Sequence, residues 1–227
     1  MLKYIYPDIC FACKKQYSKD KPLCSACTQR ITPIELKHTC TLCHAQLDTA
    51  TQLCSSCLQH PPAWQQSSSA FEFQGLGREL LLRFKYSRHL YLLPFLSQQI
   101  EISFQEAQLP EPDIITYVPM HPFKKLYRGW NQSELIAREF AKYHPQAECL
   151  SLLKRNHLGK AQASKARRER LKSVKDLFSI KKRDKIKDRS ILLIDDILTT
   201  GATLDACCKA LQKEMPKEIS ILTIARG

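Results

Sequence analysis

Eight of the eleven cysteines lie within the first 57 residues, where they form four Cys-x-x-Cys pairs. Ten residues separate the two pairs of each half, and the second half repeats the first after 30 residues. Two such pairs bring four thiolates to one tetrahedral metal ion, which is the arrangement of a zinc ribbon. The duplication therefore predicts two structural zinc ribbons. Their ligands would be Cys10, Cys13, Cys24, Cys27, Cys40, Cys43, Cys54 and Cys57.

The alternative interpretation of these cysteines is a disulfide framework, which forms in an oxidising compartment. The first residues, Met1–Asp8, contain no apolar core long enough for a secretory signal, so we expect a cytoplasmic chain with reduced cysteines. Every apolar run is too short for a membrane span, and we expect none. The spacing leaves open whether each zinc ion takes its ligands from one copy of the repeat or from both.

The segment from Ile191 to Thr203 carries a second informative pattern. It consists of four aliphatic residues, two aspartates, two further apolar residues and then Thr-Thr-Gly-Ala-Thr. Four aliphatic residues in a row predict a buried parallel strand, and the apolar spacing over Leu204–Glu214 predicts that a helix follows. The two aspartates would then lie at the carboxyl end of a strand, where open α/β sheets bind their ligands.

A turn of this composition at the start of a helix favours a phosphate ligand. Unpaired backbone N–H groups and the helix dipole attract anions there, and Gly201 lets the backbone approach a ligand closely. Threonine hydroxyl groups add donors, and the two carboxylates can hold sugar hydroxyl groups or Mg²⁺. We therefore expect a ligand with phosphate and ribose groups, bound by Asp195, Asp196, Thr199, Thr200, Gly201, Ala202 and Thr203. The simpler interpretation is a polar turn that only caps the helix.

A second strand–loop–helix unit spans about residues 114–142. β-Branched and aromatic residues predict a strand over Ile114–Val118, and apolar spacing predicts a helix over about Ser133–Lys142. The loop between them is basic, and cations at the carboxyl edge of a parallel sheet can bind pyrophosphate. An ordinary solvated basic loop is the alternative. The expected pyrophosphate loop comprises Pro119, His121, Lys125, Arg128 and Gly129.

The net charge of +13 is concentrated in one segment. Residues 151–190 carry 15 Lys and Arg against 4 Asp and Glu, which gives +11. This concentration favours polyanions such as pyrophosphate or nucleic acid, although a solvated surface would also produce it. Residues 154–162 have few apolar anchors, and we expect a mobile loop that closes over an anion. The candidate residues of this mobile basic loop and the following helix are Arg155, Lys160, Arg167 and Arg170.

These patterns divide the chain into two parts. Residues 1–64 would form the double zinc ribbon, and residues 65–227 would form an α/β domain. We expect Gln65–Ser69 to be a polar linker between them. The remaining expected elements are helices over Leu76–Tyr86 and about Leu90–Ile100 and a short strand around Cys149–Leu152.

Together these motifs resemble the ComF family of competence-associated, phosphoribosyltransferase-like proteins, over essentially the whole chain. The segment from Ile191 to Thr203 is similar to the phosphoribosyl-pyrophosphate (PRPP) signature of the type I phosphoribosyltransferases. The other parts that carry the resemblance are the double zinc ribbon, His60–Trp64, Arg83–Tyr86, Val118-Pro119, Arg128–Gln132 and Gln162 with Arg170.

The resemblance implies an α/β fold, with a type I phosphoribosyltransferase-like parallel sheet flanked by helices and an N-terminal double zinc ribbon. Asp195 and Asp196 would be the catalytic pair, in contact with the ribose hydroxyl groups or Mg²⁺. Thr199–Thr203 would bind the 5′-phosphate, and the Pro119–Arg128 loop would face the pyrophosphate. The implied cofactors are two structural zinc ions and Mg²⁺ with PRPP.

The implied role is the uptake and handling of imported single-stranded DNA during natural transformation. PRPP would be the ligand, and single-stranded nucleic acid and DNA-uptake proteins would be the partners. Two interpretations remain open. One is a Mg²⁺-dependent phosphoribosyltransferase, and the other is a non-catalytic nucleic-acid-binding or regulatory protein that uses PRPP as an effector. A fold alone does not decide between them.

Overall fold

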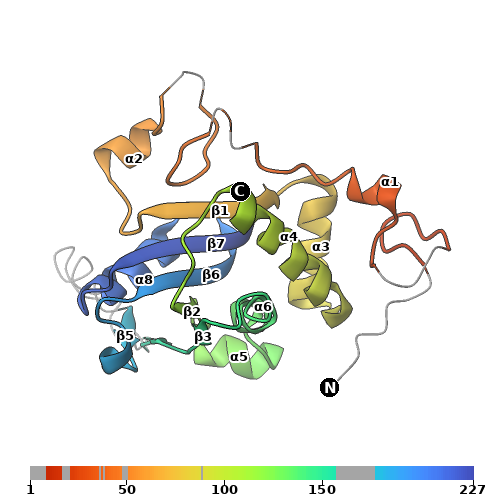
Figure 1. Ribbon diagram of the computed structural model, residues 1–227. Coiled ribbons are helices and arrows are strands. Elements are labelled where there is room, and N and C mark those ends of the chain that lie inside the picture. The colour runs from red at the N-terminus through yellow and green to blue at the C-terminus, as the bar shows by residue number, and fades with distance from the viewer. Residues whose placement is uncertain are drawn as a thin grey trace, which may run out of the picture.

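The computed structural model describes residues 9–16, 21–35, 37, 39–47, 51–87, 89–156 and 177–227. A parallel sheet with helices on both faces follows two small cysteine-rich modules (Figure 1). Each module contains one short helix, α1 (Ser25–Thr28) in the first and α2 (Ser55–Gln59) in the second. This architecture confirms the fold class expected from the sequence.

The sheet has five strands, and all of their pairings are parallel. In spatial order they are β1 (Gln66–Glu72), β7 (Glu218–Arg226), β6 (Ser190–Leu198), β2 (Ile114–Tyr117) and β3 (Glu148–Cys149). β6 lies in the middle because its aliphatic residues need cover on both faces. Parallel pairing places the carboxyl ends of all strands at one edge of the sheet, so the loops that follow the strands meet there.

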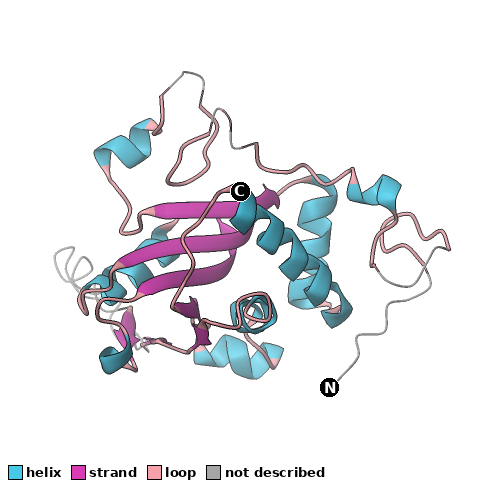
Figure 2. Cartoon of the chain, viewed as in Figure 1, coloured by secondary structure: helices cyan, strands magenta, loops and turns pink. Residues whose placement is uncertain are grey.

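Helices cover both faces of the sheet, as Figure 2 shows. One face packs against α3 (Gly75–Tyr86), α4 (Leu93–Glu106) and α6 (Gln132–Phe140), and the other packs against α8 (Ala202–Gln212). Side chains of β6 alternate between the two layers: Leu192 and Ile194 join the first, whereas Ile191 and Leu193 join the second. Of the described helices, none combines the length and hydrophobicity that crossing a membrane would need.

The expected linker at Gln65–Ser69 is wrong, because most of it belongs to β1. Ser68 and Ser69 are buried, and their hydroxyl groups find partners inside the protein. The Ser68 Oγ atom lies 2.6 Å from Ser103 Oγ, and the Ser69 Oγ atom lies 2.7 Å from Thr223 Oγ1. Hydrogen-bonded hydroxyl groups can be buried at little cost, so a serine run whose composition suggests a linker can form a strand.

Three other elements differ from expectation. The basic loop after β2 contains a helix, α5 (Pro122–Arg128). Arg155 lies in a strand rather than a mobile loop, because β4 (Leu153–Arg155) pairs with β5 (Phe178–Ile180) in a separate antiparallel ladder. The helix expected to end near Ile100 continues to Glu106, after a 3₁₀ turn at Leu90–Leu92. A second 3₁₀ turn, at Arg183–Lys185, precedes β6.

Candidate functional site

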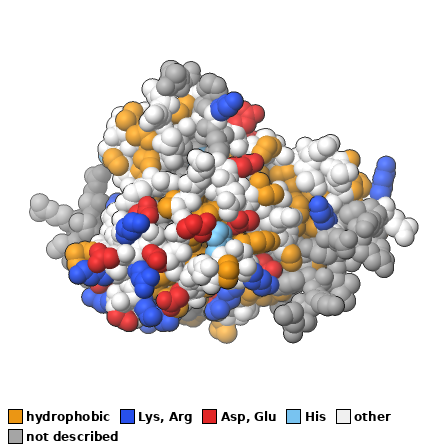
Figure 3. Space-filling view, viewed as in Figure 1, with side chains coloured by type: hydrophobic (Ala, Val, Ile, Leu, Met, Phe, Trp, Pro, Cys, Tyr) orange, Lys and Arg blue, Asp and Glu red, His pale blue; other side chains and the backbone are white. Residues whose placement is uncertain are grey.

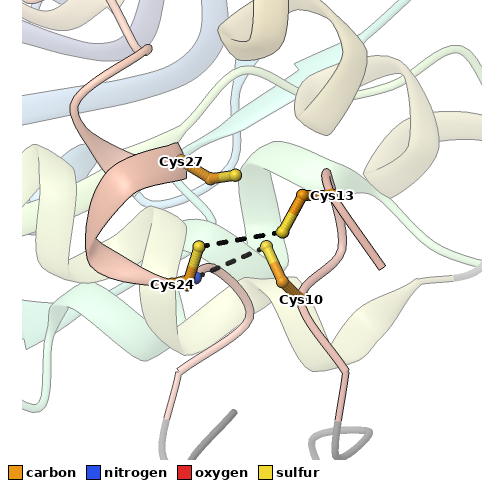
Figure 4. Close-up of side chains that lie close together, drawn as sticks. All are labelled: Cys10, Cys13, Cys24 and Cys27. Atoms are coloured by element: carbon orange, nitrogen blue, oxygen red, sulfur yellow. Dashed lines mark hydrogen bonds between the residues drawn. The ribbon is translucent and has the colours of Figure 1, made fainter. Parts of the chain in front are cut away.

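The first candidate site is a cluster of four cysteine side chains whose sulfur atoms point toward one another (Figure 4). Cys10 and Cys13 come from a tight turn, Cys24 precedes α1, and Cys27 lies in α1. All four sulfur atoms lie within 4.8 Å of one another, and those of Cys13 and Cys24 are 3.9 Å apart. Zn–S bonds of about 2.3 Å in a tetrahedron would place the sulfur atoms about 3.8 Å apart. The cluster therefore fits one zinc ion with four thiolate ligands.

The second copy of the repeat forms the same cluster with Cys40, Cys43, Cys54 and Cys57. The sulfur atoms of Cys43 and Cys54 are 3.7 Å apart. Each cluster thus takes all of its ligands from one copy, which resolves the alternative that the spacing left open. Four thiolates complete the coordination of zinc and leave no position for a substrate, so both sites are structural.

Backbone N–H groups favour the thiolate form of the first cysteine in each cluster. Burial would raise the pKa of the Cys10 thiol, but hydrogen bonds from the backbone of Cys13 and Cys24 outweigh it and lower the pKa to about 6. Burial opposes ionisation of Cys40 as well, and the backbone of Cys54 helps to lower its pKa to about 7. Zinc binds thiolates rather than thiols, so the local backbone favours the ligand form.

The second candidate site lies at the carboxyl end of β6, where Asp195 and Asp196 follow the buried aliphatic run. Ser133, at the start of α6, donates its hydroxyl hydrogen to Asp195 Oδ1 over 2.7 Å. Lys85, near the end of α3, places Nζ 2.9 Å from Asp196 Oδ2. Sequence reasoning missed both partners. Lys85 belongs to the Arg83–Tyr86 segment that carries the family resemblance, whereas Ser133 gives no signal until the fold brings α6 to β6.

Burial raises the pKa of Asp195 to about 7, and the negative charge of the adjacent Asp196 adds to this rise. The hydrogen bond from Ser133 and the charge of Lys85 oppose it without cancelling it. Two neighbouring carboxyl groups at the edge of a sheet, with one pKa strongly raised, are typical of a functional site. The arrangement suits a ligand that brings a cation or hydroxyl donors.

The turn after β6 has the conformation that an anion site needs. Gly201 is the N-cap residue of α8 and lies in the left-handed region, with φ +74° and ψ −4°. Thr199, Thr200, Ala202 and Thr203 are exposed. The start of this eleven-residue helix therefore presents backbone N–H groups, the positive end of the dipole and hydroxyl groups to solvent.

The expected pyrophosphate loop ends beside the last turn of α3. The guanidinium carbon of Arg128 lies 4.7 Å from the centre of the Tyr86 ring, and Tyr86 follows Lys85 in α3. Gly129 has φ +90°, a conformation that glycine adopts readily. Pro119 and His121 lie between β2 and α5, and the side chain of Lys125 lies outside the described residues. The structure thus brings Arg128 to the helix that contacts Asp196.

A cavity of about 730 Å³ adjoins this loop. Its lining combines residues of the expected pyrophosphate loop with charged residues of other elements, among them Pro119, Gly129, Glu134, Arg155 and Lys181. Arg155 is therefore close to the loop although it belongs to β4. Lys160, Arg167 and Arg170, the other expected residues of the mobile basic loop, lie outside the described residues.

On the face drawn in Figure 3, the described Lys and Arg side chains lie among Asp and Glu side chains. Residues 157–176, which make up half of the +11 segment, lie outside the described residues.

Comparison with known families supports both parts of the chain. Residues 1–58 match the double zinc ribbon domain, and residues 137–227 match the phosphoribosyl transferase domain. The chain is 26% identical to competence protein F of Haemophilus influenzae over 210 residues, which cover 90% of each chain. It is 25% identical to DNA utilization protein YhgH of Escherichia coli, over 96% of this chain and 90% of the relative. Identity to competence protein ComFC of Bacillus subtilis is also 25%, over 98% of this chain and 97% of the relative. These findings confirm the resemblance to the ComF family.

We expect the purified protein to contain two zinc ions per chain, one for each cluster, as measured by elemental analysis. A strong chelator should lower the midpoint of thermal unfolding, because a ribbon of about 20 residues buries too little apolar surface to be stable without its metal. Cys149→Ser, outside both clusters, should retain both ions. A folded protein without metal would contradict the assignment.

The raised pKa of Asp195 predicts how the ligand-free protein responds to pH. Between the usual value of 3.8 and about 7, the folded protein holds more protons at this carboxyl group than the unfolded chain. Its free energy of unfolding should therefore fall as pH rises through this range. Asp195→Asn removes the ionisation, so the variant should be more stable than wild type above about pH 7, by at most about 4 kcal/mol.

Urea unfolding across this range measures the effect, and the stabilisation by Asp195→Asn should shrink toward about pH 4. Asp184→Asn, an exposed aspartate in the second 3₁₀ turn, is the matched control and should change little. Equal stability of Asp195→Asn and wild type above about pH 7 would show that the site does not strain this carboxylate.

Proposed function

We propose that this chain, a relative of competence protein F in which a double zinc ribbon domain precedes a phosphoribosyl transferase domain, binds PRPP with Mg²⁺ at the carboxyl edge of its sheet. One observation carries the proposal. Asp195 and Asp196 lie near the carboxyl end of β6, which ends at Leu198, and the turn that opens α8 follows at once. Groups that suit ribose hydroxyls and groups that suit a phosphate therefore lie a few residues apart on one continuous segment.

The 5′-phosphate would bind the turn from Thr199 to Thr203. Gly201 is already left-handed, and the exposed Ala202 and Thr203 place the first backbone N–H groups of α8 at the surface. An anion at this position gains charge-assisted hydrogen bonds and the favourable helix dipole, and the threonine hydroxyl groups add donors. These gains need no rearrangement of the helix.

The ribose hydroxyl groups would meet Asp195 and Asp196. Both carboxylates already face a hydrogen-bond donor, since Ser133 donates to Asp195 and Lys85 pairs with Asp196. Hydroxyl groups of a sugar are donors of the same kind, and oxygen atoms of carboxylates are ligands that Mg²⁺ accepts. Bound Mg²⁺ would supply positive charge to the diphosphate. Bound Mg²⁺ would also favour ionisation of Asp195, whose pKa is raised by burial and by the charge of Asp196.

The pyrophosphate would lie toward Arg128, whose guanidinium is held against Tyr86 next to Lys85. Transfer at this site breaks the bond between ribose C1′ and pyrophosphate and forms a bond between C1′ and an acceptor. The pyrophosphate leaves with the electron pair. The chain then needs no nucleophile of its own, because its basic side chains stabilise the departing charge while its carboxylates hold the ribose. PRPP bound as an effector, without transfer, would use the same contacts.

Titration calorimetry with PRPP and Mg²⁺ tests the proposal. Wild type should bind, and Asp196→Asn should bind at least about tenfold more weakly, because it removes the charge that faces the ribose and metal. The exposed Asp184→Asn carries the same charge change away from the site and should keep the wild-type affinity. Folded wild type that fails to bind, or unchanged affinity in Asp196→Asn, would contradict the proposal. Release of pyrophosphate with candidate acceptors then separates an enzyme from a protein that uses PRPP as an effector.

A specific observation favours a second function, binding of single-stranded nucleic acid. Phe123 and Tyr127 of α5 are 69% and 94% exposed, and Tyr86 is 67% exposed beside Arg128. Exposed aromatic rings that stack on bases, combined with cations that track the backbone, hold single strands without sequence preference. The names of the relatives, competence protein F and DNA utilization protein YhgH, support a role in the handling of imported DNA.

Tyr127→Ala should weaken binding of a labelled single-stranded oligonucleotide by at least about fivefold, because one stacked base is lost. Fluorescence anisotropy at low and high salt measures this, and wild-type affinity should fall steeply with salt. Tyr143→Ala, an exposed tyrosine after α6, is the control and should bind as wild type does. Equal affinities of Tyr127→Ala and Tyr143→Ala would exclude α5 as the nucleic-acid surface.

A further inference from the structure

The two zinc ribbons dock on different parts of the α/β domain. In the first, Cys10, Phe11 and Cys27 join the apolar core that α3, α4 and the sheet already share. The Phe11 ring lies edge-on to the His89 ring, with 6.0 Å between the ring centres. The second ribbon, with α2, lies over β1 in Figure 1. Its His44 Nε2 atom is 2.7 Å from the carbonyl oxygen of Ser67 in β1.

The second ribbon also contacts the carboxyl ends of β7 and β6. The turn from Thr199 to Thr203 that follows β6 is called the phosphate turn below. Arg226, the last residue of β7, donates from Nε to the carbonyl oxygen of Cys43 over 2.6 Å. The same guanidinium donates from Nη1 to the carbonyl oxygen of Leu198 over 3.3 Å. Leu198 ends β6 directly before Thr199. One side chain thus joins a zinc ligand's backbone to the start of the turn.

Trp64 makes the closest connection between the ribbon and the turn. Its indole N–H donates to the carbonyl oxygen of Leu42, which lies between two zinc ligands, over 2.7 Å. Its Cη2 atom lies 3.0 Å from the place that a Cβ atom on Gly201 would occupy. The adjacent Ala63 donates its backbone N–H to Asp205 Oδ1 in the first turn of α8 over 2.9 Å. The indole therefore packs against the one left-handed residue on which the turn depends.

A cleft of about 340 Å³ lies between the ribbon and the turn. Cys43, Cys54 and Cys57 line one side of it, and Thr199, Thr200, Gly201 and Ala202 line the other. The second zinc site and the proposed phosphate site thus line the same cleft.

We propose that the second zinc ribbon positions the phosphate turn, with Trp64 as the positioning residue, so that zinc at Cys40–Cys57 supports phosphate binding and zinc at Cys10–Cys27 does not. The inference rests on the proposed PRPP site. Its physical basis is that a turn held in one conformation binds without an ordering cost, whereas a turn that is competent only part of the time binds more weakly by that fraction. The first ribbon has no such effect, because α3 is also held by α4 and the sheet.

Matched substitutions in the two ribbons test the inference. Cys54→Ser and Cys24→Ser remove equivalent ligands, and each should leave about one zinc ion per chain. Cys54→Ser should weaken PRPP binding by about tenfold or more, whereas Cys24→Ser should change it by less than about twofold although it also lowers thermal stability. Cys54→His, which supplies another zinc ligand, should restore both the second ion and the affinity.

Trp64→Phe tests the positioning residue with both zinc ions in place. Phenylalanine lacks the N–H that bonds Leu42 and the second ring that reaches Gly201, so PRPP binding should weaken by at least about fivefold. Phe104→Leu, a comparable loss from the buried core of α4, should lower stability and leave the affinity unchanged. A loss of affinity that follows only stability across these variants would overturn the inference.

The coupling between PRPP and zinc can also be measured from the side of zinc, in two variants that each carry one zinc ion. If zinc in the second ribbon strengthens PRPP binding, PRPP must strengthen zinc binding there by the same factor. At equilibrium with a competing chromogenic chelator, saturating PRPP should therefore raise the zinc retained by Cys24→Ser, which keeps the second ion, and leave that retained by Cys54→Ser unchanged. An equal effect of PRPP on zinc retention by both proteins overturns the inference while the PRPP site stands. Failure of wild type to bind PRPP overturns both.

Discussion

Two adjacent carboxylates near the end of the buried central strand are the groups around which the neighbouring helices must pack. β6 brings Asp195 and Asp196 to the middle of the sheet edge, where burial and mutual repulsion raise the pKa of Asp195. The pair is tolerated because donors arrive from two helices, Ser133 from α6 and Lys85 from α3. The packing of α3 and α6 against the sheet is therefore needed also to supply the donors that these two carboxylates require. The remaining strain on Asp195 is the kind of instability that a ligand with cations or donors relieves.

Features encoded within one short segment could be predicted from the sequence. The cysteine spacing identified both metal clusters, and the strand, turn and helix around Asp195–Thr203 were all recognised because periodicity and turn chemistry are local signals. Ser133, which is 62 residues from Asp195 in the chain, could not be found in this way, because its role exists only after α6 packs beside β6. The serines of β1 were misjudged for the same reason. Their partners, Ser103 and Thr223, lie 35 and 154 residues away.

The carboxyl edge of the sheet joins the loops into one surface. The guanidinium of Arg128, after α5, stacks on Tyr86 at the end of α3, and the neighbouring Lys85 contacts Asp196. Arg155 of β4, outside the main sheet, lines the cavity that adjoins Pro119 and Gly129. Lys85 thus pairs with Asp196, while Arg128 and Arg155 lie at the ends of the elements around the loop after β2. This mixture of signs suits a ligand that is anionic at its phosphates and a hydrogen-bond donor at its sugar, and it explains why net charge alone describes the site poorly.

The two zinc ribbons differ in the part of the α/β domain that they hold in place. A module of about 20 residues buries too little apolar surface to hold a fixed shape, and a metal with four thiolates supplies that shape. Rigidity in the first ribbon adds to a core that α3, α4 and the sheet already provide. Rigidity in the second is applied through Trp64 to Gly201, at an exposed turn that needs a left-handed residue and a fixed direction for its N–H groups. The same four-thiolate chemistry therefore packs against the shared core in one copy of the repeat and, through Trp64, against Gly201 in the other.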